Sequence, residues 1–205
     1  MSSEMKEKIE GIITDYKYGF KTEAESLYQT KRGLSRQTIL DISEAKGEPD
    51  WMKDLRLAAY ETFLQKNNPS WGPDLSQINF DDIIYYIKSS ERVEKDWNDV
   101  PQNIKDTFQK IGIPEAEQKY LAGVTTQFES EAVYHSTIQE LVDLGVVFLD
   151  TDSALREYPE YFKQYFGKAV PYTDNKYAAL NTAVWSGGSF IYVPKGVRID
   201  KPLKS

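Results

Sequence analysis

The side chains able to do chemistry in this chain are few, and the first to consider is the only histidine, His135. Glu131 lies four residues before it, a spacing that on a helix would let both side chains ligate one metal ion. The local sequence favours a strand instead, where such positions lie about 13 Å apart. The sequence therefore predicts a packed or hydrogen-bonded histidine. With a single histidine and no recognisable nucleophile turn, a Ser-His-Asp triad has no support either.

A second candidate is the acidic stretch 150–153, Asp-Thr-Asp-Ser, which begins like a calcium-binding loop. Such a loop needs glycine at its sixth position and glutamate at its twelfth, where this chain has Leu155 and Tyr161. The simpler interpretation is helix capping, with Asp152 starting a helical turn that runs through Arg156.

Three further groups resemble sites but have simpler interpretations. The glycines of Ser186–Ser189 precede a strand and lack the Gly-Lys-Ser/Thr of a phosphate loop, so they predict a corner. The adjacent acids Asp81 and Asp82 favour a helix cap, since sequence neighbours seldom point together. The aromatic residues of Tyr161–Phe166 favour core packing. The sequence thus predicts no catalytic, cofactor-binding or metal-binding residue.

Composition narrows the class of protein. The chain has 205 residues, with 25 Lys and Arg against 32 Asp and Glu, a net charge of −7 and no basic cluster. Nucleic acid and anionic membranes are therefore poor partners, because phosphate binding needs concentrated positive charge. No long apolar run or secretory leader is present at the amino terminus, so we expect a cytoplasmic protein. The absence of cysteine excludes disulfides and thiolate ligands within these residues.

The first two thirds of the chain have helical spacing. After a short helix over 6–13 and an irregular stretch over 15–20, Ser35 is a candidate N-cap for a helix that Gly47 ends. A longer helix follows, and the two predict a helical hairpin. The loop Asn67–Asp82 should tuck Trp71 and Leu75 against an apolar surface. Further helices are expected at 101–111 and 114–120.

From Gly123 onward the pattern favours strands. Strands are expected at 124–128 and 132–136, then a helix opened by a capping box at Ser136 and Gln139 and ended by Gly145. The apolar run 146–149 predicts a strand covered on both faces, which together with the preceding strand and helix would form a βαβ-like unit. A helix should start at Pro159.

The last thirty residues predict a change of architecture. Ser189–Val193 is rich in β-branched and aromatic residues between glycine and proline punctuation, so it predicts a strand. Val197 and Ile199 alternate with polar residues and predict a second one. A strand pair at a chain end cannot cover its own apolar side, and we expect it to be the beginning of a longer structure.

Several long strings follow one another over nearly the whole chain: Asp15–Phe20, Asn79–Tyr86, Gly112–Val124, Glu129–His135, Asp150–Glu157 and Thr173–Val197. Together they resemble the SufB/SufD family, and SufB in particular, a scaffold subunit of the Suf iron–sulfur cluster assembly machinery.

This resemblance implies an α+β fold: a helical region over 1–122, a small α/β unit over 123–185 and the first coil of a right-handed parallel β-helix over 186–205. A lone terminal coil should be weakly held, and we expect residues after Gly188 to fray or to swap onto a neighbouring molecule.

The resemblance also implies a non-catalytic N-terminal region of a scaffold. SufD-like and SufC-like subunits and a cysteine desulfurase or sulfur-transfer protein would be the partners of the full-length protein. The iron–sulfur cluster and its cysteine would lie beyond Ser205. Two alternatives are an interaction module or structural cap, and a β-helix enzyme acting on acidic polysaccharide.

Overall fold

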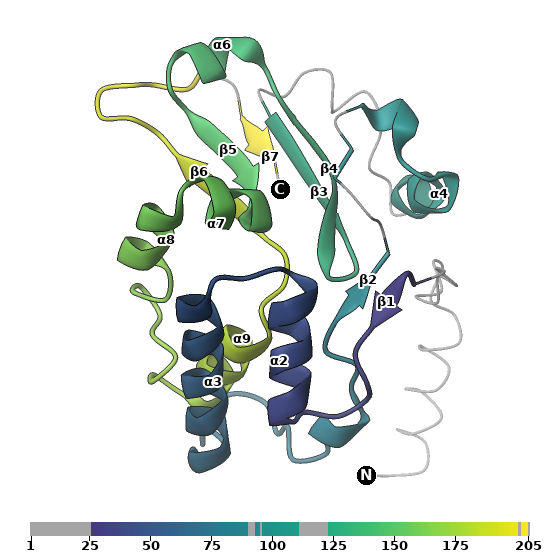
Figure 1. The fold of residues 1–205 in the computed structure, drawn as a ribbon, viewed down its shortest axis with the longest axis vertical. Coiled ribbons are helices and arrows are strands. Elements are labelled where there is room, and N and C mark those ends of the chain that lie inside the picture. The colour runs from purple at the N-terminus through teal and green to yellow at the C-terminus, as the bar shows by residue number, and fades with distance from the viewer. Residues whose placement is uncertain (1–25, 90–92, 95, 111–122, 201, 205) are drawn as a thin grey trace.

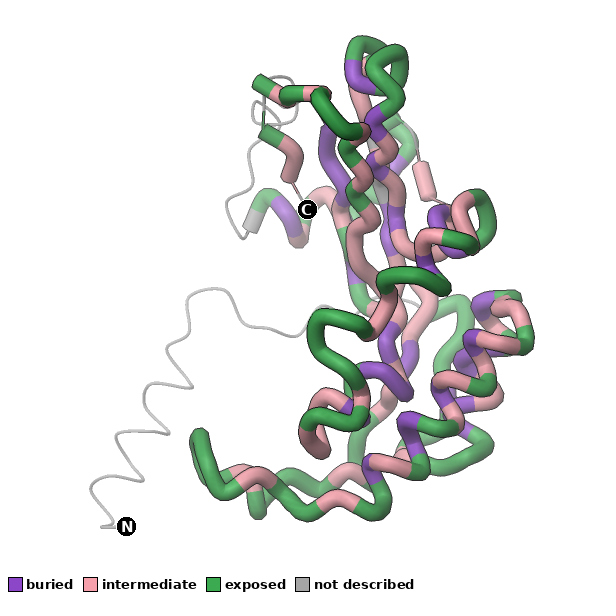
Figure 2. The backbone as a smooth tube through the Cα atoms, turned by 90° about the vertical axis from the view of Figure 1, so that its left-hand side faces the viewer, coloured by how far each residue is buried: buried purple, intermediate pink, exposed green. Residues whose placement is uncertain are grey.

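The computed structural model describes residues 26–89, 93–94, 96–110, 123–200 and 202–204. The helices expected at 6–13 and 114–120, and the irregular stretch 15–20, lie outside these residues. In the described part of the chain, a helical layer occupies one end of the molecule, two small sheets with short helices occupy the other, and a third, two-stranded sheet lies between them (Figure 1). Buried positions recur along the elements of both layers, while most connecting loops are exposed (Figure 2). No helix in the described part of the chain is both long and apolar enough to cross a membrane.

The helical layer contains the predicted hairpin, formed by α2 (Arg36–Ala45) and α3 (Asp50–Gln65). The Ser35 side chain accepts a hydrogen bond from the backbone N–H of Thr38, which confirms the predicted N-cap. A third helix, α9 (Lys176–Val184), packs against α3, with Ala59 and Ala183 both fully buried at the contact. Small side chains at this contact let the two helices approach closely. Residues from 1–122 and 123–185 therefore share one core.

The predicted strands after Gly123 form an antiparallel hairpin of β3 (Gly123–Phe128) and β4 (Glu131–Thr137). Its turn contains Glu129 at φ 53°, a left-handed conformation. Ser130 in the turn exchanges two hydrogen bonds with the backbone of Ile87, at 3.0 and 3.2 Å. Ile87 belongs to β2 (Ile87–Lys88), which pairs antiparallel with β1 (Tyr28–Gln29). The hairpin tip is thus fixed to the segment that leads out of the helical layer.

The helix α4 (Gln102–Lys110) covers this hairpin, as Figure 1 shows at the right-hand side. The short 3₁₀ helix η2 (Trp97–Asp99) precedes it. Ile104 and Phe108 of α4 are buried with Val124 and Val133 of the strands. The helix predicted at 101–111 from its apolar spacing is therefore confirmed as far as Lys110, the last described residue before position 123.

The next strand, β5 (Val147–Asp150), corrects the prediction of a βαβ-like unit. It pairs antiparallel with β6 (Ser189–Tyr192), in a register that places Val147 opposite Tyr192. Its residues alternate between buried and half-buried, so the two faces are covered unequally. The partner of β5 is a segment about forty residues later in the chain, and the local pattern of apolar residues does not reveal such a pairing.

Two helices follow β5, namely α7 (Thr151–Glu157) and α8 (Pro159–Tyr165), the latter starting at proline as predicted. The cap of α7 is Asp150, whose carboxylate accepts from the N–H groups of Asp152 and Ser153 at 3.0 and 2.9 Å. The prediction of Asp152 as the cap was wrong. Asp152 lies inside the first turn, which frees its side chain for a contact with another layer.

Three other local predictions are corrected. The helix α6 (Gln139–Asp143) has Ile138 as its N-cap, with no side-chain cap bond, and Ser136 belongs to β4, so the predicted cap position at Ser136 was wrong. No strand occurs at 197–199; the described strand is β7 (Leu203–Lys204), which lies parallel to β3. Val197 and Ile199 instead lie in an irregular segment after the turn at 195–196 and pack against Leu141 and Val146.

The loop after α3 also differs from expectation. Asn79, rather than an aspartate, caps the 3₁₀ helix η1 (Phe80–Asp82). Leu75 is half-buried, but Trp71 is 68% exposed, so the prediction that Trp71 packs against the protein was wrong.

The glycine corner before β6 is confirmed: Gly188 has φ 146°, and a Cβ at Gly187 would come within 2.4 Å of the Gln127 amide. The three-part division of the chain and the β-helix stay predictions.

Candidate functional site

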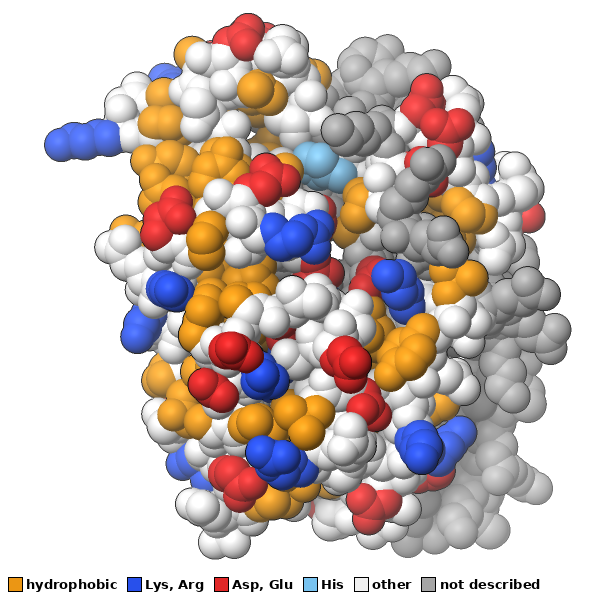
Figure 3. Space-filling view, in the orientation of Figure 1, with side chains coloured by type: hydrophobic (Ala, Val, Ile, Leu, Met, Phe, Trp, Pro, Cys, Tyr) orange, Lys and Arg blue, Asp and Glu red, His pale blue; other side chains and the backbone are white. Residues whose placement is uncertain are grey.

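A polar cleft of about 570 Å³ lies between the helical layer and the strands. The C-terminal end of α2, β2, β4, β5 and α7 contribute to its walls. The charged and polar residues that line the cleft are Lys46, Lys88, Glu131, His135, Asp150, Asp152, Ser153, Arg156 and Glu157. Figure 3 shows the hollow beside the histidine on this face of the molecule.

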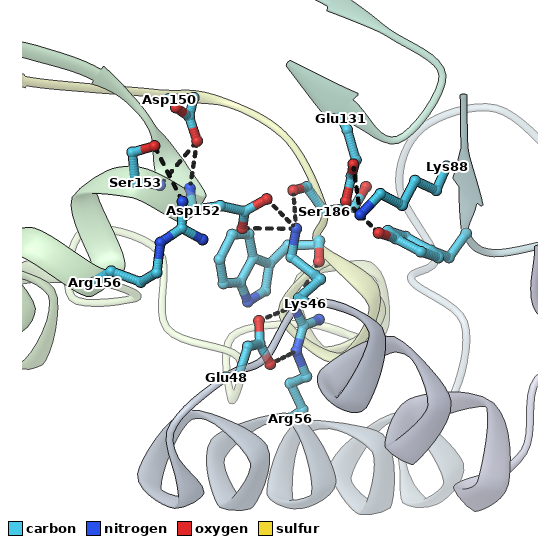
Figure 4. Close-up of polar contacts among 12 residues, drawn as sticks. Lys46, Glu48, Arg56, Lys88, Glu131, Asp150, Asp152, Ser153, Arg156 and Ser186 are labelled. Atoms are coloured by element: carbon cyan, nitrogen blue, oxygen red, sulfur yellow. Dashed lines mark hydrogen bonds and ion pairs between the residues drawn. The ribbon is translucent and has the colours of Figure 1, made fainter. Parts of the chain in front are cut away.

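Lys46 is the central cation of the cleft. It is the C-cap of α2, and its side chain is fully buried. Its Nζ lies 2.7 Å from the Asp152 carboxylate and donates to the Ser186 carbonyl at 2.6 Å (Figure 4). Burial raises the pKa of Asp152, and the attraction of Lys46 opposes this shift. Lys46 thus joins α2 both to α7 and to the segment that enters β6.

Arg56 of α3 makes a second connection just below the cleft. Its Nε and Nη2 donate to the two carboxylate oxygens of Glu48 at 2.7 and 2.6 Å, and both side chains are fully buried. Its remaining N–H groups donate to the carbonyls of Ala183 and Trp185 at 3.0 and 2.8 Å. The guanidinium also lies 4.6 Å from the centre of the Trp185 ring. We call Lys46, Asp152, Glu48 and Arg56, with the carbonyls they bind, the charged junction.

Glu131 occupies the opposite wall, at the start of β4. The buried Tyr86 hydroxyl donates a hydrogen bond to its carboxylate, and the Lys88 ammonium lies 4.0 Å away. Burial, with a smaller contribution from the bond to Glu131, raises the pKa of Tyr86. Tyr86 therefore stays neutral at physiological pH and serves as a hydrogen-bond donor that connects the β2 segment to the hairpin.

His135 lies on β4 as the sequence predicted, and it is both packed and hydrogen-bonded. Its Nδ1 is 2.8 Å from the Thr125 hydroxyl and its Nε2 is 3.2 Å from the Thr137 hydroxyl. The ring meets Phe148 edge to face, with centroids 5.2 Å apart. Glu131, four residues earlier, instead binds Tyr86 and Lys88. Among the described residues, no three His, Asp or Glu side chains are grouped to hold a metal ion.

The other candidates from the sequence lie apart from the cleft or support it structurally. Asp82 pairs with Arg32 at 2.9 Å on the surface. In the aromatic stripe Phe162 is buried against Phe190, while Tyr165 is 61% exposed, so the prediction of core packing holds for only part of it. At the rim of the cleft, Arg156 contacts Ser153 at 3.2 Å.

Sequence reasoning missed the charged junction. Its one available signal was Arg56, which shares a face of α3 with the buried apolar residues Met52, Ala59 and Phe63. A charged side chain on the apolar face of a helix needs a buried partner. The identity of that partner depends on the fold, since Ala183 and Trp185 are more than 120 residues away. Chemically, the arrangement neutralises its own charges and holds three segments together.

The known proteins to which this chain is similar share one family description. The profile of the SufBD protein N-terminal region matches residues 33–204. An iron–sulfur cluster assembly SufBD family protein of Staphylococcus haemolyticus is 57% identical over 193 residues, which are 94% of this chain and 42% of that protein. Relatives with the same description from Staphylococcus epidermidis and Staphylococcus aureus are 56% and 55% identical over the same shares. The chain thus spans about two fifths of the length of these relatives. It belongs to the SufBD family of iron–sulfur cluster assembly proteins and corresponds to their N-terminal region.

Proposed function

We propose that this chain is the non-catalytic N-terminal region of a scaffold subunit of the Suf system, acting in the cytoplasm. Its task is to hold the chain segment 183–186, which leads into β6, in a fixed position. The observation that carries the proposal is the charged junction, in which Lys46 and Arg56 bind three backbone carbonyls of this segment, those of Ala183, Trp185 and Ser186.

The physical argument concerns rigidity. Buried charge-assisted hydrogen bonds have strict geometry, and removing one partner leaves the other charge buried and unpaired. A backbone segment held by two such cations therefore has one favoured position. Because β6 begins three residues after Ser186, the edge of β6 that no described strand occupies would be presented at a defined angle. The β-helix that the resemblance implies would begin on this edge, so the helical layer would act as its cap.

We place the cluster chemistry in the part of the relatives that this chain does not span. SufD-like and SufC-like subunits would then be partners of the full-length protein. Support comes from family membership and from the pairing of Lys46, Asp152, Glu131 and Lys88 with one another, which leaves their charges neutralised. Anaerobic reconstitution with iron and sulfide tests this directly. We expect no visible-range cluster absorbance from this chain, and a stable cluster would refute the proposal.

A second experiment tests the capping role in the full reading frame. In a bacterium that lacks its own SufB-type protein, we would compare the wild type with Arg56→Met and with Lys53→Met. Lys53 is a matched control, because its ion pair with Asp50 on the same helix is exposed. Aconitase activity reports cluster supply. We expect Arg56→Met to lose it and Lys53→Met to keep it; full activity of both variants would contradict the capping role.

One observation favours a second candidate, an interaction module that positions partners. The 68% exposure of Trp71 is unusual for a tryptophan, whose large apolar surface is generally buried. Pull-down with a cysteine desulfurase and with a sulfur-transfer protein separates the two roles. Binding that depends on Trp71 would favour the module, and absence of binding at high concentration would favour the cap.

A further inference from the structure

We propose that the loop containing Trp71 is a docking site for a partner polypeptide that carries a Lys or Arg next to an apolar side chain. The site is a groove of about 280 Å³ on the outer side of the helical layer, remote from the polar cleft. It is lined by Pro69, Trp71, Pro73, Asp74, Leu75 and Tyr177. The inference does not depend on the role in cluster assembly.

The groove has the composition of a binding surface. Trp71 is 68% exposed, and the lining of the hollow also contains two prolines, a leucine and a tyrosine beside the polar residues Asn68, Asp74 and Ser76. Tryptophan is the residue type most enriched among those that dominate binding energies, because it offers a large rigid apolar area with a hydrogen-bond donor. An exposed tryptophan beside a hollow is therefore better explained by a partner than by folding.

The groove also provides polar recognition at its base. Tyr177 comes from the first turn of α9, and its hydroxyl is buried without a hydrogen-bond partner among the described residues. Its ring lies 6.4 Å from that of Phe80, which fixes its position against η1. A buried hydroxyl that lacks a partner costs free energy. A modest shift of the loop on binding would let a partner's backbone supply the missing hydrogen bond.

The loop is ordered before binding. Pro69 and Pro73 fix two φ angles on either side of Trp71. The Asp74 carboxylate accepts from the N–H of Ser76 at 2.9 Å, and the N–H of Ile78 donates to the Leu75 carbonyl at 3.1 Å. An ordered loop loses little conformational entropy on association, so more of the contact free energy appears as affinity.

The charge around the groove selects a cationic partner. Between Asn67 and Ile87 the chain has three aspartates and no Lys or Arg, and Asp74 is the one charged residue among the described residues that line the groove. Lys176, which precedes the lining residue Tyr177 in the chain, donates its Nζ to the Lys66 carbonyl at 3.0 Å. Asp82 is already paired with Arg32, but Asp74, which lines the groove, has no cation bound among the described residues. The hydrogen bond from Ser76 lowers the pKa of Asp74, which keeps the carboxylate charged. A Lys or Arg of the partner could form an ion pair with Asp74 and a cation–π contact with the Trp71 ring.

The size of the groove argues for a polypeptide over a small molecule. A volume of about 280 Å³ is just below the usual range of drug-sized ligand sites, and it suits one or two side chains of a segment that continues across the surface. Grooves lined by aromatic side chains are also a recurring binding surface for extended peptides.

Selection from a phage-displayed library of short random peptides tests the proposal with the intact chain. Enriched peptides would be titrated against the wild type, Trp71→Ser, Asp74→Asn and the control Leu64→Ser. Leu64 is 55% exposed on the adjacent helix, so its variant removes a comparable exposed apolar group outside the groove. Circular dichroism establishes that each variant is folded, as expected for exposed positions.

We expect enriched peptides that combine Lys or Arg with apolar residues. Their affinity should fall about tenfold or more in Trp71→Ser, fall less in Asp74→Asn, weaken with added salt and stay unchanged in Leu64→Ser. Acidic or neutral peptides, no enrichment, or binding indifferent to Trp71→Ser would overturn the proposal. A wild type that sediments as a dimer while Trp71→Ser sediments as a monomer would show that a second copy occupies the groove, which also overturns it.

Discussion

Replacing Arg56 by methionine should destabilise the fold more than any change of a surface charge. The side chain is fully buried and donates four hydrogen bonds, two to the buried carboxylate of Glu48 and two to the carbonyls of Ala183 and Trp185. Methionine is comparable in length and apolar, so the variant leaves Glu48 charged and unpaired in the interior. Breaking one partner of a buried pair costs about 3–5 kcal/mol.

The two carbonyls add to this loss. A buried acceptor that loses its donor costs about 1–3 kcal/mol. Since the total free energy of unfolding of a natural domain is about 5–15 kcal/mol, Arg56→Met should leave a marginally stable protein. Urea unfolding followed by far-ultraviolet circular dichroism measures the change as a shift of the midpoint.

The double variant Glu48→Met, Arg56→Met separates the two contributions. It removes both charges together, so the cost of the unpaired carboxylate disappears and only the carbonyl losses remain. We therefore expect it to be more stable than Arg56→Met alone. Lys53→Met, which opens the exposed pair with Asp50, should leave the midpoint nearly unchanged. The reasoning is refuted if Arg56→Met matches Lys53→Met, or if the double variant is no more stable than the single one.

Three further measurements examine other parts of the structure. Burial raises the pKa of Asp152 above its value in the unfolded chain. The contribution of Asp152 to the free energy of unfolding is therefore largest in acid and is lost as pH rises through the raised pKa. The wild-type pH profile of the free energy of unfolding, minus that of Asp152→Asn, should show this contribution. A Cβ at Gly123 would lie 2.5 Å from the buried ring of Phe148, so Gly123→Ala should lower the free energy of unfolding by about 1–3 kcal/mol in urea titrations. The amides of 190–193 should exchange hydrogen well before those of α3, because β6 pairs with a single strand of four residues.

Each of these three predictions would be contradicted by a particular result. A difference profile that is flat, or that rises with pH above the ordinary range of Asp, would contradict the burial of Asp152. For Gly123 the comparison is Gly187→Ala, where the Cβ meets only the flexible Gln127 side chain and the loss should be smaller; equal losses would remove the distinction. Strong protection of 190–193 in a monomer would show that β6 is held more firmly than its pairing suggests.

The local elements were largely predictable from the sequence, because their signals lie within a few residues. The cap at Ser35, the apolar spacing of α2 and α3, the proline at the start of α8 and the strand 189–192 all formed as expected. Where local signals competed, prediction failed. At 150–152 two aspartates could each cap α7, and Asp150 does so because Lys46 attracts Asp152 into the interface.

The sequence by itself determined the helical hairpin, the β3–β4 hairpin and the strand character around His135, since backbone propensity and side-chain period are set by near neighbours. Tertiary structure alone decided which strand pairs with β5, which carbonyls Arg56 and Lys46 bind, and that Trp71 faces solvent. The β5–β6 pairing joins residues about forty positions apart, and the carbonyls that Arg56 and Lys46 bind lie more than a hundred positions from them. A buried cation takes whichever acceptors the fold brings within reach, and no local pattern encodes that choice.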